Sequence, residues 1–307
     1  MPDFVLGHTQ DWLDRFSAEG YRPYPLAAGV EGAIYDLGND VIAKVWRARQ
    51  MAELESMQRF YVDVAAVGLP FETPQIERID HVCGHAVTYE RKLPGVPLQD
   101  QLQDGDQDIA PDATECVVSV LQALATVGAT DSMRKLAVLD ENKPLWAGAD
   151  SYPAALLALL ARRVAQFGEV IRGHLPDFDA RYNALTAQIR GLPDRPATVI
   201  HGDLFGGNIL VDTCTRPLAV LDFGFLTSAG DPAMDAAITA GVMNMYGPHA
   251  GRITEELTGR FARELDYDLE TLRIYQAAYA VATSNAFTSD GTDGHFAWCI
   301  DQLRRLD

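Results

Sequence analysis

The chain has 307 residues, of which 48% are hydrophobic and 22% are charged, values typical of a soluble globular protein. Its formal net charge of −18 argues against nucleic acid and anionic membranes as partners, because their phosphates attract basic surfaces, and it is compatible with a cationic substrate. The four cysteines form no CxxC pair, no apolar run is long enough to span a bilayer and the N-terminus lacks a signal-peptide pattern, so we expect a reduced, cytoplasmic protein without disulfides or zinc.

The first part of the chain predicts a small β-rich unit with one main helix. Residues 32–46 hold two β-rich runs around Gly38-Asn39-Asp40, which is typical of a hairpin. Apolar residues recur at spacings of three and four across residues 47–67, which indicates a helix. The segments TPQIERID and HAVTYERKL predict two further strands.

The stretch LPGVPL at residues 93–98 is rich in proline and glycine and is typical of a linker. We therefore expect one domain over residues 1–93 and a second over residues 94–307, with a ligand cleft between them. The second domain is mostly helical and has short strands only within residues 197–223. Its predicted helices span residues 112–128, 152–172, 177–190, 231–246, 252–265, 268–286 and 294–305.

The segment VIHGDLFGGNILVD, residues 199–212, places many polar groups between apolar runs. Phosphoryl transfer needs a carboxylate that orients the attacking hydroxyl, and oxygen ligands that hold a charge-neutralising metal. Asp203 supplies a carboxylate, and Asn208 supplies an amide oxygen. Asp222 supplies a second carboxylate after an apolar run, and a hairpin between the two runs would place Asn208 and Asp222 where they could share one Mg²⁺.

Four motifs in this region match the pattern of a known family. They are His201-Gly202-Asp203, Asn208, Leu221-Asp222-Phe223-Gly224, and GDPAMDAAI at residues 230–238. Through them the chain resembles the aminoglycoside phosphotransferase family of protein-kinase-like enzymes, over about residues 20 to 246. The resemblance implies an α+β, protein-kinase-like, two-lobed fold, with a small β-rich N-lobe that has one main helix and a larger, mostly helical C-lobe.

The resemblance also implies roles for the motif residues. Asp203 would be the catalytic base, and His201, our second candidate in the catalytic set, would support the catalytic loop. Asn208 and Asp222 would bind Mg²⁺ as the metal ligands.

The GDPAMD motif would brace the catalytic loop and begin a helix. Asp231 precedes Pro232, and an aspartate before a proline is a favourable N-cap. We therefore expect a structural rather than a catalytic role for Asp231 and Asp235.

A kinase-like first domain would bind ATP or GTP as the phosphoryl donor. Lys44, in the run DVIAKVW, would pair with the nucleotide phosphates. Its partner on the following helix would be Glu53, which fits the family's E-x-x-x-L-x-x-L pattern, while Glu55 would face solvent.

The remaining nucleotide contacts are expected from a glycine loop and a hinge. Gly29 and Gly32 of AAGVEGAI would approach the phosphates, although alanine stands where protein kinases have their first glycine. Backbone groups of Glu90, Arg91 and Lys92 would meet the purine.

The acceptor is expected to be a small hydroxyl-bearing molecule, because no A-P-E triplet or activation segment follows LDFG. Residues 93–307 carry 16 Lys and Arg against 29 Asp and Glu, which favours a cationic acceptor. Candidate cation-binding segments are residues 99–108, residues 264–270, Asp290 and Asp293, although such charge runs are usually solvated. The Tyr275 and Tyr279 pair favours the core over a choline-binding cage.

An aminoglycoside-type antibiotic is the leading acceptor, which would make the protein an antibiotic-resistance enzyme. The alternatives are a homoserine-kinase-like enzyme, suggested by the DLF triplet, and a kinase for macrolides or another metabolite. A catalytically inactive nucleotide-binding module is disfavoured, because every expected catalytic residue is present. These are Lys44, Glu53, Asp203, Asn208 and Asp222.

Overall fold

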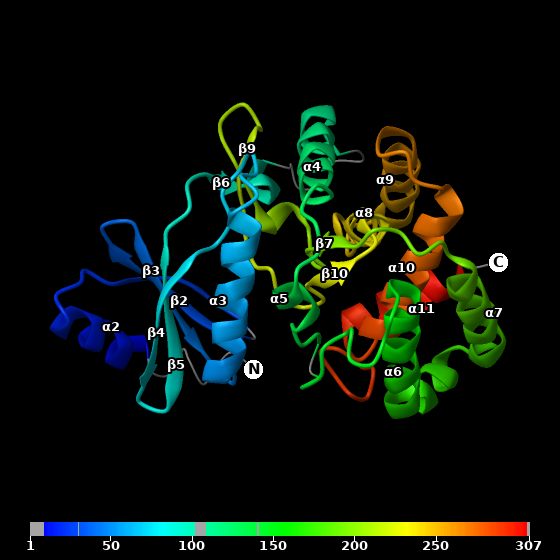
Figure 1. Ribbon diagram of the computed structural model, residues 1–307, viewed down its shortest axis with the longest axis horizontal. Coiled ribbons are helices and arrows are strands. Elements are labelled where there is room, and N and C mark those ends of the chain that lie inside the picture. The colour runs from blue at the N-terminus through cyan, green and yellow to red at the C-terminus, as the bar shows by residue number, and fades with distance from the viewer. Residues whose placement is uncertain (1–8, 30, 102–108, 140, 306–307) are drawn as a thin grey trace. The chain divides into compact units, whose positions relative to one another are not determined.

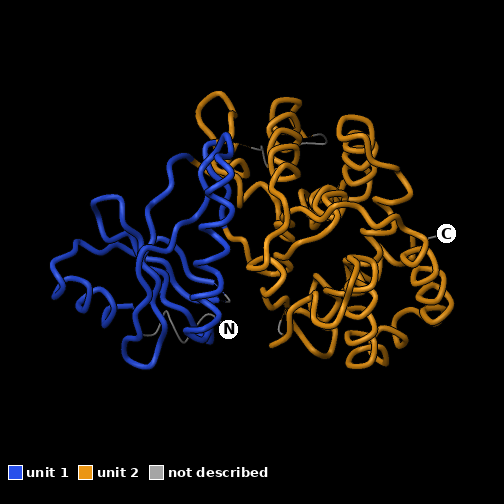
Figure 2. The backbone as a smooth tube through the Cα atoms, viewed as in Figure 1, with its two compact units in different colours: residues 1–95, 218–221 blue, residues 96–217, 222–307 orange. Residues whose placement is uncertain are grey.

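The computed structural model describes residues 9–29, 31–101, 109–139 and 141–305 (Figure 1). It contains two compact units, one of residues 1–95 with 218–221 and one of residues 96–217 with 222–307 (Figure 2). Residues 218–221 join the first unit through backbone pairing, which the sequence analysis did not predict. The Glu72 N–H donates to the Leu218 carbonyl at 2.8 Å, and the Val220 N–H donates to the Glu72 carbonyl at 2.9 Å.

The first unit is built on a five-stranded sheet in the order β1-β2-β3-β5-β4, whose pairs are antiparallel. The strands are β1 (Tyr24–Ala28), β2 (Gly32–Gly38), β3 (Val41–Trp46), β4 (Ile76–Val82) and β5 (His85–Arg91). The predicted hairpin is confirmed: Asn39 and Asp40 join β2 to β3 with φ values of 53° and 60°, as a tight hairpin turn requires. The two further predicted strands are β4 and β5, whereas β1 was not predicted.

The sheet lies between two helices, α2 (Thr9–Ala18) and α3 (Met51–Ala65) (Figure 1). Trp12 and Phe16 of α2 pack against one face of the sheet, in a buried cluster with Tyr35, Val87 and Tyr89. Burial of each such side chain contributes roughly 1.5–3 kcal/mol. The helix predicted over residues 47–67 is α3, and it begins only at Met51 because Gln50 is extended.

The second unit contains all seven predicted helices. They are α4 (Pro111–Leu124), α6 (Tyr152–His174), α7 (Phe178–Gly191), α8 (Pro232–Val242), α9 (Ala250–Glu264), α10 (Leu269–Thr283) and α11 (Gly294–Arg304). A short helix that was not predicted, α5 (Asp131–Arg134), lies between α4 and α6. Among the described residues, none of the helices has the length and apolar character required to cross a membrane.

The short segments of the second unit frame its polar loop. They are β6 (Val96–Pro97), η1 (Leu98–Gln101), β7 (Thr198–Ile200), η2 (Gly206–Asn208), β8 (Ile209–Val211), the start of β9 (Pro217–Val220) and β10 (Ser228–Gly230). β7 pairs with β10, and β6 pairs with β8. The chain reverses between β8 and β9, where the Asp212 N–H donates to the Arg216 carbonyl at 3.0 Å, and this is the predicted hairpin turn.

Helix α8 is the central helix of this unit. Nearly all its residues are buried, and it packs against α9 and α10. A helix that is apolar on all sides is stable only where other elements surround it. Its position matters for function because its first residues carry the two aspartates of GDPAMD.

Candidate active site

The loop that follows β7 is anchored to α8 by one buried carboxylate. The Asp235 side chain accepts a hydrogen bond from the His201 N–H at 2.7 Å and another from the Gly202 N–H at 2.8 Å. Asp235 is only 3% exposed, so these two amides are its main compensation for leaving water. The structure thus confirms the bracing role expected for this residue.

Burial and hydrogen bonding act in opposite directions on Asp235. Burial disfavours the ionised form and raises the pKa of the carboxyl to about 6, although the two backbone amides lower it. At neutral pH the side chain is therefore ionised and accepts from both amides. It becomes protonated only in mild acid.

Gly202 is required by the shape of the loop. Its φ is 78°, in the left-handed region, and a Cβ atom there would lie 2.5 Å from the Leu226 carbonyl carbon. Both constraints exclude a side chain. The residue before Asp203 is therefore held close against the backbone at Leu226.

His201 contacts the loop from a buried position. It is fully buried, and its Nδ1 atom accepts from the Asp203 N–H at 3.2 Å. Its ring lies 4.5 Å, between centroids, from the ring of Phe223, which follows Asp222. The Thr227 hydroxyl donates to the His201 carbonyl at 2.6 Å. The buried His201 side chain therefore contacts the backbone of Asp203, and its part in catalysis stays a prediction.

Asn208 is fixed by the same loop. Its amide nitrogen donates to the Asp203 carbonyl at 2.9 Å, so the oxygen Oδ1 remains as its acceptor atom. Asp222, the other predicted metal ligand, is exposed and has a φ of 50°. An amide oxygen and a carboxylate are hard oxygen donors, which fits Mg²⁺, an ion that usually takes one or two protein ligands and completes its shell with water and phosphate. Within the described residues no group of three or more His, Cys, Asp or Glu side chains could hold a metal.

The other aspartate of GDPAMD starts a helix, as predicted. Asp231 is the N-cap of α8, accepts from the Ala233 N–H at 3.0 Å, and is followed by Pro232. It also accepts from the Tyr275 hydroxyl at 2.9 Å. Tyr275 and Tyr279 are both buried, which confirms their expected place in the core.

The first unit places Lys44 on β3, half-buried and opposite Thr88 of β5. Its Nζ atom lies 3.5 Å from Glu31 Oε2 and 4.1 Å from the centroid of the Trp46 ring. The cation is therefore held at the sheet by a carboxylate and an aromatic face.

The expected pairing of Lys44 with Glu53 stays a prediction, and the contacts of Glu53 in this structure are local ones. The Glu53 carboxylate accepts from the Gln50 N–H at 2.6 Å and lies 3.9 Å from Arg49 Nη1. The reason is the start of α3 at Met51, which makes Glu53 the third helical residue, where a glutamate caps the helix. Glu55 is exposed, as expected.

The two glycines of the expected phosphate loop differ in what they do. A Cβ atom on Gly32 would lie 1.9 Å from the Val45 carbonyl oxygen, so this glycine allows β2 to approach β3. The Gly29 N–H donates to the Gly32 carbonyl at 2.8 Å, and the space around Gly29 is open. A phosphate contact at either glycine stays a prediction.

The hinge residues have three different environments. Glu90 is 8% exposed and accepts from the Thr88 hydroxyl at 2.7 Å. Arg91 forms an ion pair with Glu72, and Lys92 forms one with Asp36. From the sequence, only backbone groups were expected to matter at this position, and the burial of the Glu90 side chain was not predicted. The available signal was a charged residue inside the predicted strand HAVTYERKL.

The acidic segments proposed for cation binding mostly serve local structure. Asp268 caps α10 by accepting from the Thr271 N–H at 2.8 Å, and Asp293 caps α11 by accepting from the Phe296 N–H at 2.8 Å. Of the segment 99–108, residues 102–108 lie outside the described residues. A direct role in acceptor binding stays a prediction for these segments.

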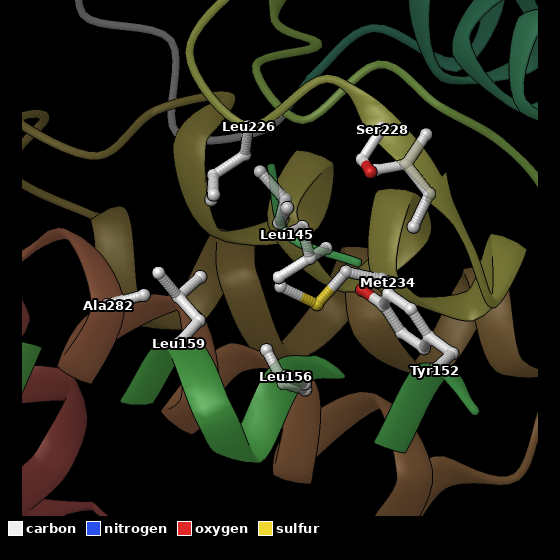
Figure 3. Close-up of a pocket in the computed structure, with 10 residues that line it drawn as sticks. Leu145, Tyr152, Leu156, Leu159, Leu226, Ser228, Met234 and Ala282 are labelled. Atoms are coloured by element: carbon white, nitrogen blue, oxygen red, sulfur yellow. The ribbon is translucent and has the colours of Figure 1, made fainter. Parts of the chain in front are cut away.

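Two cavities in the second unit are not lined by the predicted catalytic residues Asp203 and His201. One of about 10 Å³ is lined mainly by apolar side chains from α6, α8 and β7, together with Leu226 and Ser228 (Figure 3). It is large enough for about one water molecule, so it is no substrate site. A groove of about 690 Å³ is lined by α7, α9, α10 and α11. None of the predicted catalytic, nucleotide-binding or metal-binding residues lines it, although Glu270 of the candidate cation-binding segment 264–270 does.

Comparisons with solved structures show the fold. Aminoglycoside phosphotransferase APH(3'')-Id from Streptomyces rimosus is 16% identical with a TM-score of 0.54, over 90% of this chain and 98% of that one. Macrolide 2'-phosphotransferase MphH from Brachybacterium faecium is 16% identical with a TM-score of 0.58, over 97% and 99%. Aminoglycoside 2'-phosphotransferase-IIIa is 16% identical with a TM-score of 0.59, over 98% and 97%. The predicted α+β, protein-kinase-like fold is confirmed.

Comparison with families extends this result from fold to family. No curated protein sequence matches the chain. The model of the phosphotransferase enzyme family (APH), however, matches residues 24–278, which is well over half of the chain. The protein therefore belongs to this family and is a phosphotransferase.

Proposed function

We propose that the protein transfers the γ-phosphoryl group of ATP or GTP to a hydroxyl of a small cationic molecule, with an aminoglycoside-type antibiotic as the leading acceptor. The observation that carries the proposal is the buried Asp235 carboxylate, which holds the backbone on the N-terminal side of Asp203 at two points. Such rigid positioning is what phosphoryl transfer requires, because the enzyme does little covalent chemistry itself.

Each residue of the second unit has a separate task in this proposal. Asp203 orients the acceptor hydroxyl and takes its proton as the new bond from the hydroxyl oxygen to the γ-phosphorus forms. The bond from the γ-phosphorus to the β,γ-bridging oxygen breaks, and the nucleoside diphosphate leaves. Asn208 Oδ1 and the Asp222 carboxylate hold Mg²⁺, which neutralises phosphate charge when bound. His201 and Asp235 touch neither substrate and keep Asp203 in place.

In the first unit, Lys44 binds the nucleotide phosphates and the backbone of Glu90 to Lys92 meets the purine. Two similar folds support a nucleotide and a cationic acceptor as substrates. One is APH(3'')-Id with ADP and streptomycin, 17% identical with a TM-score of 0.54, and the other is APH(2")-IIIa with GDP and kanamycin, 16% identical with a TM-score of 0.58. The proposed biological role is antibiotic resistance in the cytoplasm.

A macrolide is the second candidate acceptor, and one observation favours it. Phe287 is 54% exposed, and its ring stacks on that of Phe225 with 5.9 Å between centroids and 11° between planes. Phe225 follows Asp222 by three residues, so this apolar surface lies within about 11 Å of the proposed metal ligand by chain length alone. An exposed aromatic stack there suits an acceptor with an apolar face.

The deciding experiment is a panel of acceptors tested with ATP and with GTP in the presence of Mg²⁺. The panel holds aminoglycosides, macrolides, homoserine, choline and simple sugars, and phosphate transfer is followed with γ-labelled nucleotide. Turnover of an aminoglycoside supports the proposal. If only homoserine or a macrolide is phosphorylated, that compound replaces the aminoglycoside as the proposed acceptor. If no member of the panel is phosphorylated and no nucleotide binds, the proposal is overturned.

A further inference from the structure

Two cations of the first unit share one carboxylate. Lys44 Nζ lies 3.5 Å from Glu31 Oε2, and Arg49 Nη2 donates to Glu31 Oε1 at 2.9 Å. The two cations therefore contact different oxygens of the same side chain. Glu31 lies in the turn between β1 and β2, Lys44 on β3, and Arg49 in the segment before α3. The fold thus gathers three charged groups from separate elements at one place.

The ring of Trp46 holds the two cations beside each other. Lys44 Nζ lies 4.1 Å and Arg49 Cζ lies 6.0 Å from the centroid of this ring. The residue is only 2% exposed, and its indole N–H donates to Thr88 Oγ1 at 3.0 Å, so the ring itself is fixed. An aromatic face attracts a cation within about 6 Å of its centroid. The positions of the cations therefore depend on a buried ring as well as on Glu31.

Glu31 is the most accessible member of this group. Its side chain is 45% exposed, whereas the side chains of Lys44 and Arg49 are 14% and 21% exposed. An ion pair that reaches water contributes little net stability, because its charges are solvated well when they separate. Arg49 Nη1 also lies 3.9 Å from Glu53 Oε1, so this cation keeps one partner when Glu31 moves away. Another anion can therefore replace Glu31 at small cost.

We propose that Arg49 is a second phosphate-binding cation beside Lys44, and that Glu31 competes with the phosphates of the donor nucleotide for both. The inference rests on the proposed function, in which Lys44 binds these phosphates. Two cations that hold both oxygens of a carboxylate present the charges that a di- or triphosphate requires, since phosphate oxygens accept the same charge-assisted hydrogen bonds. The planar guanidinium of arginine is especially suited to phosphate. The Glu31 carboxylate thus marks the place of a phosphate group.

Competition gives the two residues effects of opposite sign on nucleotide affinity. The phosphates bind only to the fraction of molecules in which Glu31 has left the cations, so the apparent Kd is the intrinsic Kd divided by that fraction. Loss of the Glu31 charge therefore tightens binding, whereas loss of the Arg49 charge weakens it. A purely structural ion pair predicts the same direction for both changes, because either one breaks the pair.

The test measures nucleotide affinity, so that it does not depend on the acceptor. Calorimetry with the full chain and Mg²⁺ is carried out with ADP and with GDP, and the diphosphate that the wild type binds more tightly is used for the variants. We expect Glu31→Gln to lower its Kd about two- to tenfold, since exposed ion pairs compete only weakly. Arg49→Gln should raise the Kd about tenfold or more, because it removes a charge-assisted hydrogen bond to phosphate.

A second ion pair of the same sheet supplies matched controls for net charge. Arg78 and Asp80 of β4 lie 3.3 Å apart, and the Arg78 guanidinium lies 3.7 Å from the ring centroid of Tyr89, a member of the cluster that packs with α2. Arg78→Gln and Asp80→Asn make the same changes of charge as the two site variants. Each should leave the Kd within about twofold of the wild type. Control shifts as large as those of the site variants overturn the inference, because net charge alone then explains them.

Unchanged or weaker binding by Glu31→Gln, or a Kd of folded Arg49→Gln within about twofold of the wild type, also overturns the inference. Thermal unfolding of each variant shows that the compared proteins are folded. If Arg49→Gln does not fold, the sign of the change in the exposed variant Glu31→Gln still decides the matter. If the wild type binds neither ADP nor GDP, the proposed function fails. If it binds one of them but the two variants do not shift in opposite directions, only this inference fails.

Discussion

Replacing Asp235 with asparagine separates the positioning of the catalytic loop from the stability of the fold. The Asp235 carboxylate is the acceptor for the His201 and Gly202 amides, and it is fully enclosed. Asparagine has nearly the same shape, but only its oxygen can accept a hydrogen bond. Its amide nitrogen therefore faces one of the two backbone amides, and the loop loses one of its two anchors.

The energetic effect can be worked out from the pKa of Asp235, which burial raises from its ordinary 3.8 to about 6. Because the pKa is higher in the folded state, ionisation of Asp235 lowers the free energy of unfolding by about 3 kcal/mol. This loss grows as the pH rises from about 4 to 6 and is complete above that range. Asp235→Asn removes this cost. It also leaves a buried amide without its acceptor, which costs about 1–3 kcal/mol. The two effects nearly offset, so the free energy of unfolding at pH 7.5 should change by less than about 2 kcal/mol.

Activity should respond much more strongly than stability. Small displacements of a catalytic group lower the rate by up to about 100-fold, so we expect kcat of Asp235→Asn to fall about 10- to 100-fold with little change in nucleotide affinity. The assays are steady-state phosphoryl transfer and urea unfolding at the same pH. The matched control is Asp231→Asn, since asparagine is an equally good N-cap and kcat should be nearly unchanged. A kcat for Asp235→Asn within about twofold of the wild type, at similar stability, would refute the positioning role.

Three further predictions concern the same unit. Gly202→Ala should lower the free energy of unfolding by about 3 kcal/mol or more in urea titrations, because its Cβ atom meets the backbone of Leu226 at an unfavourable φ; an unchanged midpoint contradicts the clash. Asp222→Ala should abolish the gain in nucleotide affinity that Mg²⁺ provides, and an unaltered Mg²⁺ titration would remove Asp222 from the metal site. Wild-type kcat should decline below about pH 6, as protonation of Asp235 weakens its hold on the loop, and the Asp235→Asn profile should lack this decline; parallel profiles would exclude Asp235 as its source.

Local patterns were sufficient for the helices and turns of this chain. Apolar periodicity located the helices of the second unit, and Gly38-Asn39-Asp40 located the hairpin of the first. Asn208, which motif spacing singled out, lies in the same loop as Asp203, and its amide donates to the Asp203 carbonyl. These features depend on residues close in sequence, which is why the sequence predicts them.

Features that depend on distant residues could not be predicted in this way. Residues 218–221 belong with the first unit because they pair with Glu72, far away in the chain. The capping role of Glu53 was not predicted, because it depends on the exact start of α3, which the sequence pattern does not fix. The burial of Glu90 follows from sheet register, which the sequence pattern of β5 alone does not fix.

The central claim is that Asp203 acts on the acceptor hydroxyl and not on the nucleotide, and single-turnover transfer by Asp203→Ala tests it most directly. The variant should bind nucleotide and Mg²⁺ with affinity within about threefold of the wild type, while its transfer rate falls by about 100-fold or more. Asp203→Asn, which keeps the shape without the basic oxygen, should behave in the same way. Transfer at more than about a tenth of the wild-type rate, or a collapse of nucleotide affinity in a folded variant, would contradict the account.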